Sequence, residues 1–188
     1  MAKLTYINNV SLDGYSEDGR GAFDFGPMTD DVFVTYTDLI STVGTFLYGR
    51  RLYETMAPWE TEPALAGQSP LTADFATAWQ AAQKIVYSTT LNSTPTVNTR
   101  IERSFTPGVI DQLKAGAAED LTVGGANLAS RALHAGLVDE CILFVWPVTV
   151  GGGKPALPTD AELTLHLLDE QRFSNGTLLL RYQPQRRG

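Results

Sequence analysis

Residues 120–140 read DLTVGGANLASRALHAGLVDE, and this stretch decides the class of the fold. Leu121–Val123 is a short apolar run typical of a strand, and it stops at two glycines. An apolar pattern at helical spacing then continues to about Ala135, where Gly136 ends it. Two residues without side chains at a strand-to-helix junction indicate unusual backbone angles or a large anion close to the backbone.

Strand patterns alternate with helical patterns on both sides of this junction. The sequence predicts strands over 4–10, 45–48, 84–87, 101–105, 121–123 and 141–150, and helices over about 30–43, 50–56, 73–82, 109–115 and 126–135. Residues 15–28 and 57–72 contain many Gly, Pro and polar residues and are expected to form loops. Pro147 predicts a bulge or an edge position late in the strand over 141–150.

The C-terminal part carries a hairpin signal. Two strand-like runs, 163–173 and 177–182, flank Asn175-Gly176, a dipeptide that favours tight hairpin turns. Strands that alternate with helices and close with an antiparallel hairpin predict a three-layer α/β fold. The chain length of 188 residues fits a single domain over 1–188.

Composition and charge exclude several classes of function. The net charge of −7 argues against general affinity for nucleic acid or for an anionic membrane surface. Cys141 is the single cysteine of the chain, so no internal disulfide forms. No cluster of His, Cys and acidic residues has metal-ligand spacing, and the N-terminal residues lack a signal-peptide h-region. We therefore expect a cytoplasmic protein without a metal.

Three predicted strand ends share a character that suits one ligand. They are Tyr48-Gly49-Arg50-Arg51, Tyr87-Ser88-Thr89-Thr90 and Val123-Gly124-Gly125-Ala126-Asn127. Ligands of open α/β sheets bind beyond the carboxyl ends of the strands. Taken singly, the first is better explained as solvated arginines and the second as an ordinary polar turn, while the third is about equally well explained as a close-packing turn. Together they indicate a dinucleotide, and arginine beside hydroxyls indicates a 2′-phosphate and hence NADP.

Two familiar phosphate-binding motifs are absent from the sequence. Residues 124–129 lack the Gly-x-Gly-x-x-Gly pattern of the Rossmann fold. Gly151–Lys154 looks like the end of a P-loop, but Pro155 stands where Ser or Thr would bind magnesium.

Five motifs in this order resemble one known family. They are Ser11-Leu-Asp-Gly14, Leu47-Tyr-Gly-Arg-Arg-Leu-Tyr-Glu54, Asp120-Leu-Thr-Val-Gly-Gly-Ala-Asn-Leu128, Gly136-Leu-Val-Asp-Glu140 and Pro147-Val-Thr-Val-Gly-Gly-Gly-Lys-Pro-Ala-Leu157. The chain resembles, over essentially its whole length, the dihydrofolate reductase-like proteins related to the C-terminal reductase domain of the bacterial riboflavin-biosynthesis protein. The resemblance implies a mostly parallel sheet of about eight strands, NADPH as hydride donor, a small-molecule substrate and a homodimer.

The resemblance also implies positions for the cofactor. The turns at Gly49, Arg50, Arg51 and at Gly124, Gly125, Ala126, Asn127, Leu128 would hold its phosphates. Ser88 and Thr89 would lie near the adenosine 2′-phosphate, and Asn9 near the nicotinamide. The family often has Thr two residues after the first arginine, where this chain has Leu52, so one hydrogen bond to the cofactor is in doubt.

Substrate contacts and an acid are harder to place. The resemblance puts the Asp13 loop near the substrate and Gly152 at the border of the same cleft, and Tyr15 is one of several loop aromatics that suit stacking on a flat heterocycle. Asp13 is the first candidate acid, with a simple Asp-Gly turn as the alternative. Classical dihydrofolate reductases carry an acid on the first helix, for which Asp30 and Asp31 are the nearest candidates and helix capping is the alternative. Folate is therefore not predicted as the substrate.

Three functions remain open from sequence. The first is an NADPH-dependent reductase that transfers a hydride to a small planar heterocycle or to a carbonyl or imine. The second is an NADP(H)-binding or sensing protein without turnover, which Leu52 and the lack of a clear acid favour. The third is a hydrolase or transferase that uses the glycine turns for another phosphate ligand.

Overall fold

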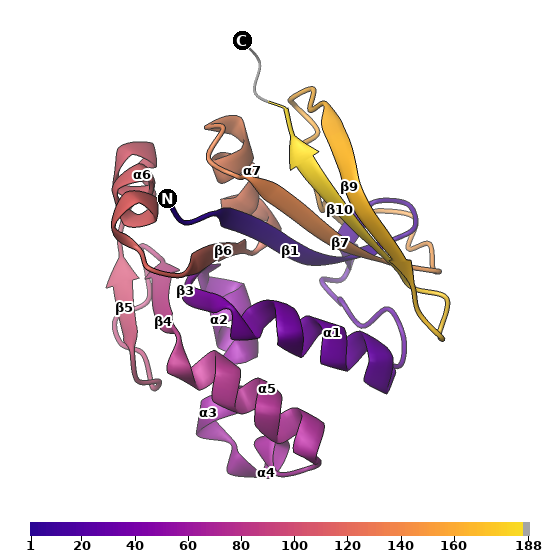
Figure 1. Cartoon of the computed structure of the whole chain (residues 1–188), viewed down its shortest axis with the longest axis horizontal. Helices are drawn as coiled ribbons and strands as arrows, with labels where there is room; N and C mark the ends of the chain where they lie inside the picture. Colours follow the sequence, from indigo (N-terminus) through magenta and orange to yellow (C-terminus); the bar gives the residue numbers. More distant parts are fainter. Residues whose placement is uncertain (186–188) are drawn as a thin grey trace.

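The computed structural model describes residues 1–185, and its centre is an eight-stranded sheet of order β5-β4-β3-β6-β1-β7-β10-β9 (Figure 1). Its strands are β1 Leu4–Ser11, β3 Val43–Gly49, β4 Gln83–Tyr87, β5 Thr99–Glu102, β6 Asp120–Gly124, β7 Glu140–Trp146, β9 Leu165–Arg172 and β10 Leu178–Pro184. The first six strands in this order, from β5 through β4, β3, β6 and β1 to β7, run parallel. Strand β10 is antiparallel to both of its neighbours, β7 and β9. This confirms the predicted α/β fold with its closing antiparallel hairpin.

Helices cover both faces of the sheet and make the three layers (Figure 1). Helices α1 Asp30–Ser41 and α5 Pro70–Ala81 share one apolar cluster with Phe46 and Tyr48 of β3. Leu47, between them, joins the cluster of α6 Pro107–Gly116 and α7 Ala126–His134. Because successive strand residues point to opposite faces, the continuous apolar runs of the sequence serve a sheet buried on both sides.

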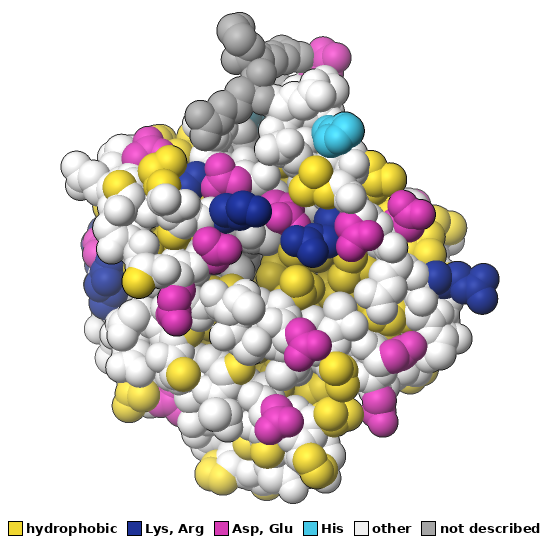
Figure 2. Space-filling view, viewed as in Figure 1, with side chains coloured by type: hydrophobic (Ala, Val, Ile, Leu, Met, Phe, Trp, Pro, Cys, Tyr) yellow, Lys and Arg dark blue, Asp and Glu magenta, His cyan; other side chains and the backbone are white. Residues whose placement is uncertain are grey.

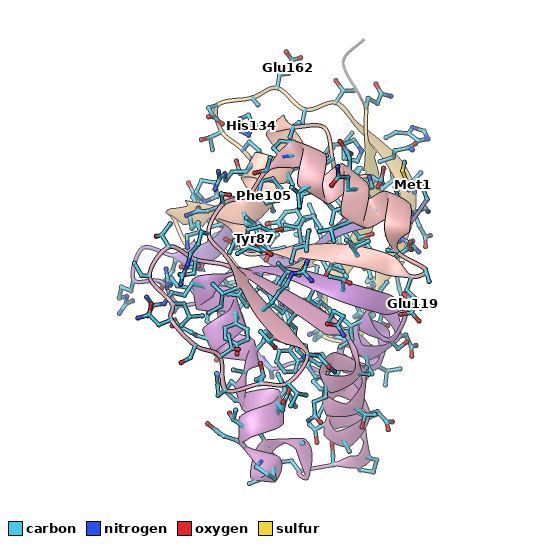
Figure 3. The ribbon with its side chains drawn as sticks, turned by 90° about the vertical axis from the view of Figure 1, so that its left-hand side faces the viewer. Met1, Tyr87, Phe105, Glu119, His134 and Glu162 are labelled. Atoms are coloured by element: carbon cyan, nitrogen blue, oxygen red, sulfur yellow. The ribbon has the colours of Figure 1, made fainter. Side chains whose placement is uncertain are left out.

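The apolar cluster beneath α6 and α7 extends to β4, the second strand from one edge of the sheet. There Tyr87 and Phe105 meet with their ring centroids 5.3 Å apart at a steep interplanar angle of 68°, close to α6 (Figure 3). This edge-to-face arrangement is the favourable one for two aromatic rings.

The predicted loop over 57–72 is wrong in most of its length. Helix α2 Arg50–Met56 is followed by α3 Pro58–Thr61 and α4 Pro63–Ala66, and α5 already begins at Pro70. Each of these prolines occupies the first turn of its helix, where the missing N–H has no intrahelical partner to lose. Each proline therefore starts a helix, whereas sequence analysis interpreted these prolines as signs of a loop.

Other predicted element ends also move, and the strand predicted over 101–105 lies at Thr99–Glu102. The first helix stops at Ser41 and not at residue 43, because Val43 already pairs with Asp120 as the start of β3. The strand predicted over 141–150 stops at Trp146, since Pro147 has no N–H to continue the ladder. β7 lies between β1 and β10, so it is an internal strand and not an edge.

A small second sheet was not predicted. Part of the expected loop over 15–28 forms β2 Tyr15–Asp18, which pairs antiparallel with β8 Gly153–Pro155. Gly153 has φ +145°, and a Cβ there would lie 1.9 Å from the carbonyl oxygen of Glu17. Only glycine permits so close a pairing, which explains the last glycine of the run 151–153.

The surface is mixed in charge. On the face in Figure 2, most of the described Lys and Arg side chains stand next to Asp and Glu side chains. Within residues 1–185, no helix has the length and apolar character needed to cross a bilayer.

Candidate functional site

A cavity of about 480 Å³ lies where β1, β3 and β6 approach their carboxyl ends. Its wall has a polar part and an aromatic part. The polar part consists of Asn8, Asn9, Ser16, Glu17, Arg50, Arg51, Thr55, Asn127 and Lys154, together with Gly125, Ala126 and Leu128 from the start of α7. The rest is apolar: Ile7, Phe23, Met28, Phe33, Tyr36, Leu52, Met56, Trp59 and Phe75.

Most of the residues predicted to bind a cofactor share this cavity. Those that line it are Asn9, Arg50, Arg51, Gly125, Ala126, Asn127 and Leu128. Gly49 and Gly124 lie directly behind this wall: a Cβ on Gly125 would be 3.8 Å from the Gly49 nitrogen, and a Cβ on Gly49 would be 3.9 Å from the Gly124 oxygen. The turns after β3 and β6 therefore sit side by side, as their places in the sheet require.

The two glycines after β6 have different physical causes. Gly125 has φ +89°, a conformation that L side chains rarely adopt. At Gly124 the cause is space, because a Cβ there would lie 2.5 Å from Cδ2 of Leu52 and 3.0 Å from the ring of Tyr48. Leu52 thus fills the gap above Gly124 with an apolar group.

The start of α7 is open to a ligand. Its N-cap is Gly125, and no described side chain caps the helix. The first N–H groups of a helix lack intrahelical partners and carry the positive end of its dipole, so they favour an anion. Ala126, Asn127 and Leu128 bring these groups to the cavity wall.

The two arginines after β3 reach different partners. Arg50 donates to the Glu54 carboxylate at 2.7 Å and, through Nη1, to Thr90 Oγ1 at 2.8 Å. Arg51 Nη1 lies 3.1 Å from Glu17 Oε2, and its side chain is 66% exposed. Both guanidinium groups remain accessible from the cavity, which suits charge-assisted bonds to phosphate.

The hydroxyls after β4 are arranged differently from the prediction. Ser88 Oγ accepts from the backbone N–H groups of Thr90 and Leu91, so it shapes the turn. Ser88 and Thr89 do not line the cavity, whereas Thr90 contacts the cavity residue Arg50. Thr90 belongs to the same predicted strand end, but sequence analysis did not predict it as a cofactor-binding residue.

Asp13 serves the loop and not the cavity. Its carboxylate accepts from Ser11 Oγ at 2.7 Å, from the Gly151 N–H at 2.8 Å and from the Val150 N–H at 3.1 Å. These donors, Ser11 first, lower the pKa of Asp13 below its usual value. A carboxylate held in this way is a poor proton donor. The cavity lining includes none of Asp13, Tyr15 and Gly152.

Asp31 has a comparable structural role. It accepts from Thr29 Oγ1 at 2.5 Å, from the Ser174 N–H at 2.8 Å and from the Val32 N–H at 3.0 Å. These bonds lower its pKa to about 2, with Thr29 as the largest cause. Asp31 therefore joins the start of α1 to the C-terminal hairpin turn and does not line the cavity.

Glu17 and Lys154 are cavity residues that sequence analysis missed. They come from the paired strands β2 and β8, and Lys154 Nζ lies 2.7 Å from Glu17 Oε1. Glu17 also pairs with Arg51, so one carboxylate links two cations. The only sequence signal was Lys154 at the end of the glycine run, which the failed P-loop comparison set aside.

The aromatic part of this wall is built mainly from α1, α3 and α5. Phe75 is its centre, with ring centroids 4.6 Å from Trp59 and 5.4 Å from Phe33. Phe23 and Trp59, two aromatic residues of the segments that were expected to be loops, line the cavity. Phe25, from the same expected loop as Phe23, packs against the core beside β7. Such a wall accepts the face of a flat ring.

A mostly parallel sheet with this strand order and an antiparallel C-terminal hairpin is the dihydrofolate reductase-like fold. Residues 2–179 match the RibD C-terminal domain, and the chain belongs to that family. The chain is 28% identical over 185 residues to the uncharacterized protein YyaP of Bacillus subtilis, which covers 92% of this chain and 90% of that protein.

Solved structures share the fold. A putative riboflavin biosynthesis protein from Shewanella sp. PV-4 superposes with a TM-score of 0.76 at 20% identity, over 99% of this chain and 100% of that one. A pyrimidine reductase-like protein from Corynebacterium diphtheriae has a TM-score of 0.66 at 15% identity, over 99% and 93%. A Thermotoga maritima diaminohydroxyphosphoribosylaminopyrimidine deaminase/5-amino-6-(5-phosphoribosylamino)uracil reductase has a TM-score of 0.65 at 15% identity, over 98% of this chain and 57% of that one.

Proposed function

We propose that this protein is an NADPH-dependent reductase that acts on a small planar heterocycle or on a carbonyl or imine. The observation that carries the proposal is one cavity with two ends of different chemistry. Arg50, Arg51 and the start of α7 line one end, and aromatic rings of α1, α3 and α5 line the other. The first end suits the phosphates of a dinucleotide, and the second suits a flat acceptor.

The residues present fit the cofactor. The uncapped N–H groups at 126–128 and the exposed Arg51 side chain offer donors to phosphate oxygens. Arg50 and Thr90 together place a cation beside a hydroxyl, the combination that suits a 2′-phosphate. When bound, NADPH would supply a hydride to the carbon of a C=O or C=N bond, and the oxygen or nitrogen of that bond would take up one proton.

The chain's own part is binding and orientation. The aromatic wall orients the flat acceptor, and the polar end fixes the cofactor relative to it. Because Asp13 and Asp31 are held by hydrogen bonds outside the cavity, we assign the proton to neither residue and expect it to come from water or from a cavity hydroxyl.

A second candidate function is an NADP(H)-binding or sensing protein without turnover. The observation that favours it is the structural engagement of both candidate acids, together with Leu52 in place of a hydroxyl beside Gly124. Both functions require the same cofactor site and differ only in the fate of the bound dinucleotide.

The test is titration of the purified protein with NADPH and NADH by calorimetry, followed by absorbance at 340 nm during a screen of heterocycles, carbonyls and imines. A preference for NADPH of at least tenfold and acceptor-dependent oxidation would support the reductase. NADPH binding without oxidation across the screen would favour the sensing protein. Lack of binding by either dinucleotide would reject both.

We further propose a homodimer, on the resemblance to the family alone. Light scattering of the purified protein measures its mass directly, and a monomer at micromolar concentration would reject this proposal.

A further inference from the structure

The aromatic end of the cavity is a fixed basin. We use "aromatic basin" for Phe33, Tyr36, Trp59 and Phe75, which line the cavity next to one another. Their rings contact each other in series, and Tyr36 in addition lies 5.1 Å from the ring of Phe144 in β7. Because Phe75 and Phe144 are buried, the basin rests on the core and keeps its shape.

The cations of the cavity pair with residues outside the aromatic basin. Within the described chain, Arg50, Arg51 and Lys154 are the basic residues that line it. Arg50 is bound to Glu54 and Thr90, and Lys154 to Glu17, all at the polar end. The aromatic basin therefore offers no positive charge, and burial of an unpaired anion there would cost free energy.

The basin has two polar side-chain groups, the Tyr36 hydroxyl and the Trp59 indole N–H, and the first can both donate and accept. Within residues 1–185, the Tyr36 hydroxyl makes no hydrogen bond to the protein, although the residue lines the cavity. Burial raises the pKa of Tyr36 to about 12, so the phenol keeps its proton near neutral pH and can donate it in a hydrogen bond. A half-buried donor without a protein partner favours a ligand that carries an acceptor atom.

We propose that the aromatic basin binds an uncharged flat ring that carries a carbonyl or ring-nitrogen acceptor, with the Tyr36 hydroxyl donating to that acceptor. This inference rests on the proposed reductase function and narrows its substrate class. It separates this chain from a substrate such as that in the name of the Thermotoga maritima structure, which contains a phosphoribosyl group. A phosphate at this end would face aromatic carbon and neutral donors only, the Tyr36 hydroxyl and the Trp59 indole N–H, with no cation.

The experiment uses two naphthoquinones that differ at one substituent. 2-Methyl-1,4-naphthoquinone is uncharged, and 1,4-naphthoquinone-2-sulfonate has the same flat ring and carbonyls with an anion in place of the methyl. Calorimetry measures the Kd of each for the protein saturated with NADP⁺, so that the polar end is occupied and turnover is prevented. We expect the methyl compound to bind at least tenfold more tightly.

A matched pair of variants then tests the hydroxyl. Tyr36→Phe removes only an oxygen, and we expect it to weaken binding of the methyl compound about two- to tenfold, as for one neutral hydrogen bond. Tyr182→Phe, in β10 and outside the cavity lining, makes the same chemical change and should leave that Kd unchanged. Both variants should keep the Kd for NADP⁺ and the melting temperature of the parent.

The outcomes separate the two proposals. If NADP⁺ does not bind, the proposed function itself fails. If NADP⁺ binds but the sulfonate binds as tightly as the methyl compound, or neither quinone binds, the substrate class is wrong. If Tyr36→Phe and Tyr182→Phe give the same Kd, the assigned role of the Tyr36 hydroxyl is wrong.

Discussion

Arg50 and Thr90 are 40 residues apart in the sequence, and a hydrogen bond of 2.8 Å from Nη1 to Oγ1 joins them. The bond links the start of α2 to the turn after β4, at the polar end of the cavity. It holds the guanidinium in one orientation before any ligand arrives. Preorganisation of this kind lowers the entropy lost when an anion binds.

The first prediction concerns this arginine. We expect Arg50→Ala to weaken NADPH binding more than about tenfold, because a charge-assisted hydrogen bond contributes about 1.5–3 kcal/mol. NADH should lose less affinity, since it lacks the 2′-phosphate. Arg100→Ala is the matched control: Arg100 is also exposed and paired with a glutamate, Glu102, but it does not line the cavity. Equal Kd values for the two variants by calorimetry would contradict the assignment.

The second prediction concerns Glu17, whose carboxylate competes with a phosphate for Arg51 and Lys154. We expect Glu17→Gln to tighten NADPH binding about two- to fivefold at low ionic strength, because the partly buried carboxylate no longer competes for the two cations. The gain should shrink as salt screens the charges. Glu102→Gln, which releases Arg100 instead, should leave the Kd unchanged. Weaker binding by Glu17→Gln at every salt concentration would show that the carboxylate supports the site.

The sequence predicted which turns meet in the cavity better than it predicted the aromatic part of the wall, and the reason is physical. Glycines and arginines at strand ends are local signals, and the carboxyl ends of parallel strands meet at one edge whatever the loops do. Arg50 and Gly125 therefore come together in the cavity as expected. The aromatic basin depends on how α1 packs against α5, which hydrophobic spacing alone does not determine.

The acids show the opposite case. Asp13 was a candidate because of its place in a motif, but its partners Val150 and Gly151 lie far along the chain. No local pattern reveals that these N–H groups turn toward it. The same holds for Glu17 and Lys154, which meet only because β2 and β8 pair. The prediction of a loop around the prolines at 58, 63 and 70 was wrong for a different reason. A proline that starts a helix and a proline that breaks one look alike in sequence.

The third prediction tests the packing at Gly124. We expect Gly124→Ala to lower the free energy of unfolding by about 1–3 kcal/mol, because its Cβ would overlap Leu52 and Tyr48. Gly108→Ala, in α6 with nothing within 4 Å of the added Cβ, should leave stability unchanged or slightly raised. Urea unfolding measures both. In a double-mutant cycle, Leu52→Ala should cost less in the Gly124→Ala background than in the parent, and simple additivity would contradict the proposed contact.

The last prediction concerns acid stability through Asp31, which joins α1 to the hairpin turn at Ser174. Its pKa falls from 3.8 to about 2 on folding, so the folded state favours the ionised form. The stabilisation is therefore complete above pH 4 and is lost as the pH falls through about 2. We expect Asp31→Asn to lower the melting temperature above pH 4 and to approach the parent between pH 4 and pH 2. Asp30→Asn, on the same helical turn, should keep the parent's pH profile, because Asp31 and not Asp30 holds the Ser174 N–H. A constant difference between Asp31→Asn and the parent across that pH range would show that the link to the hairpin does not depend on the charge of Asp31.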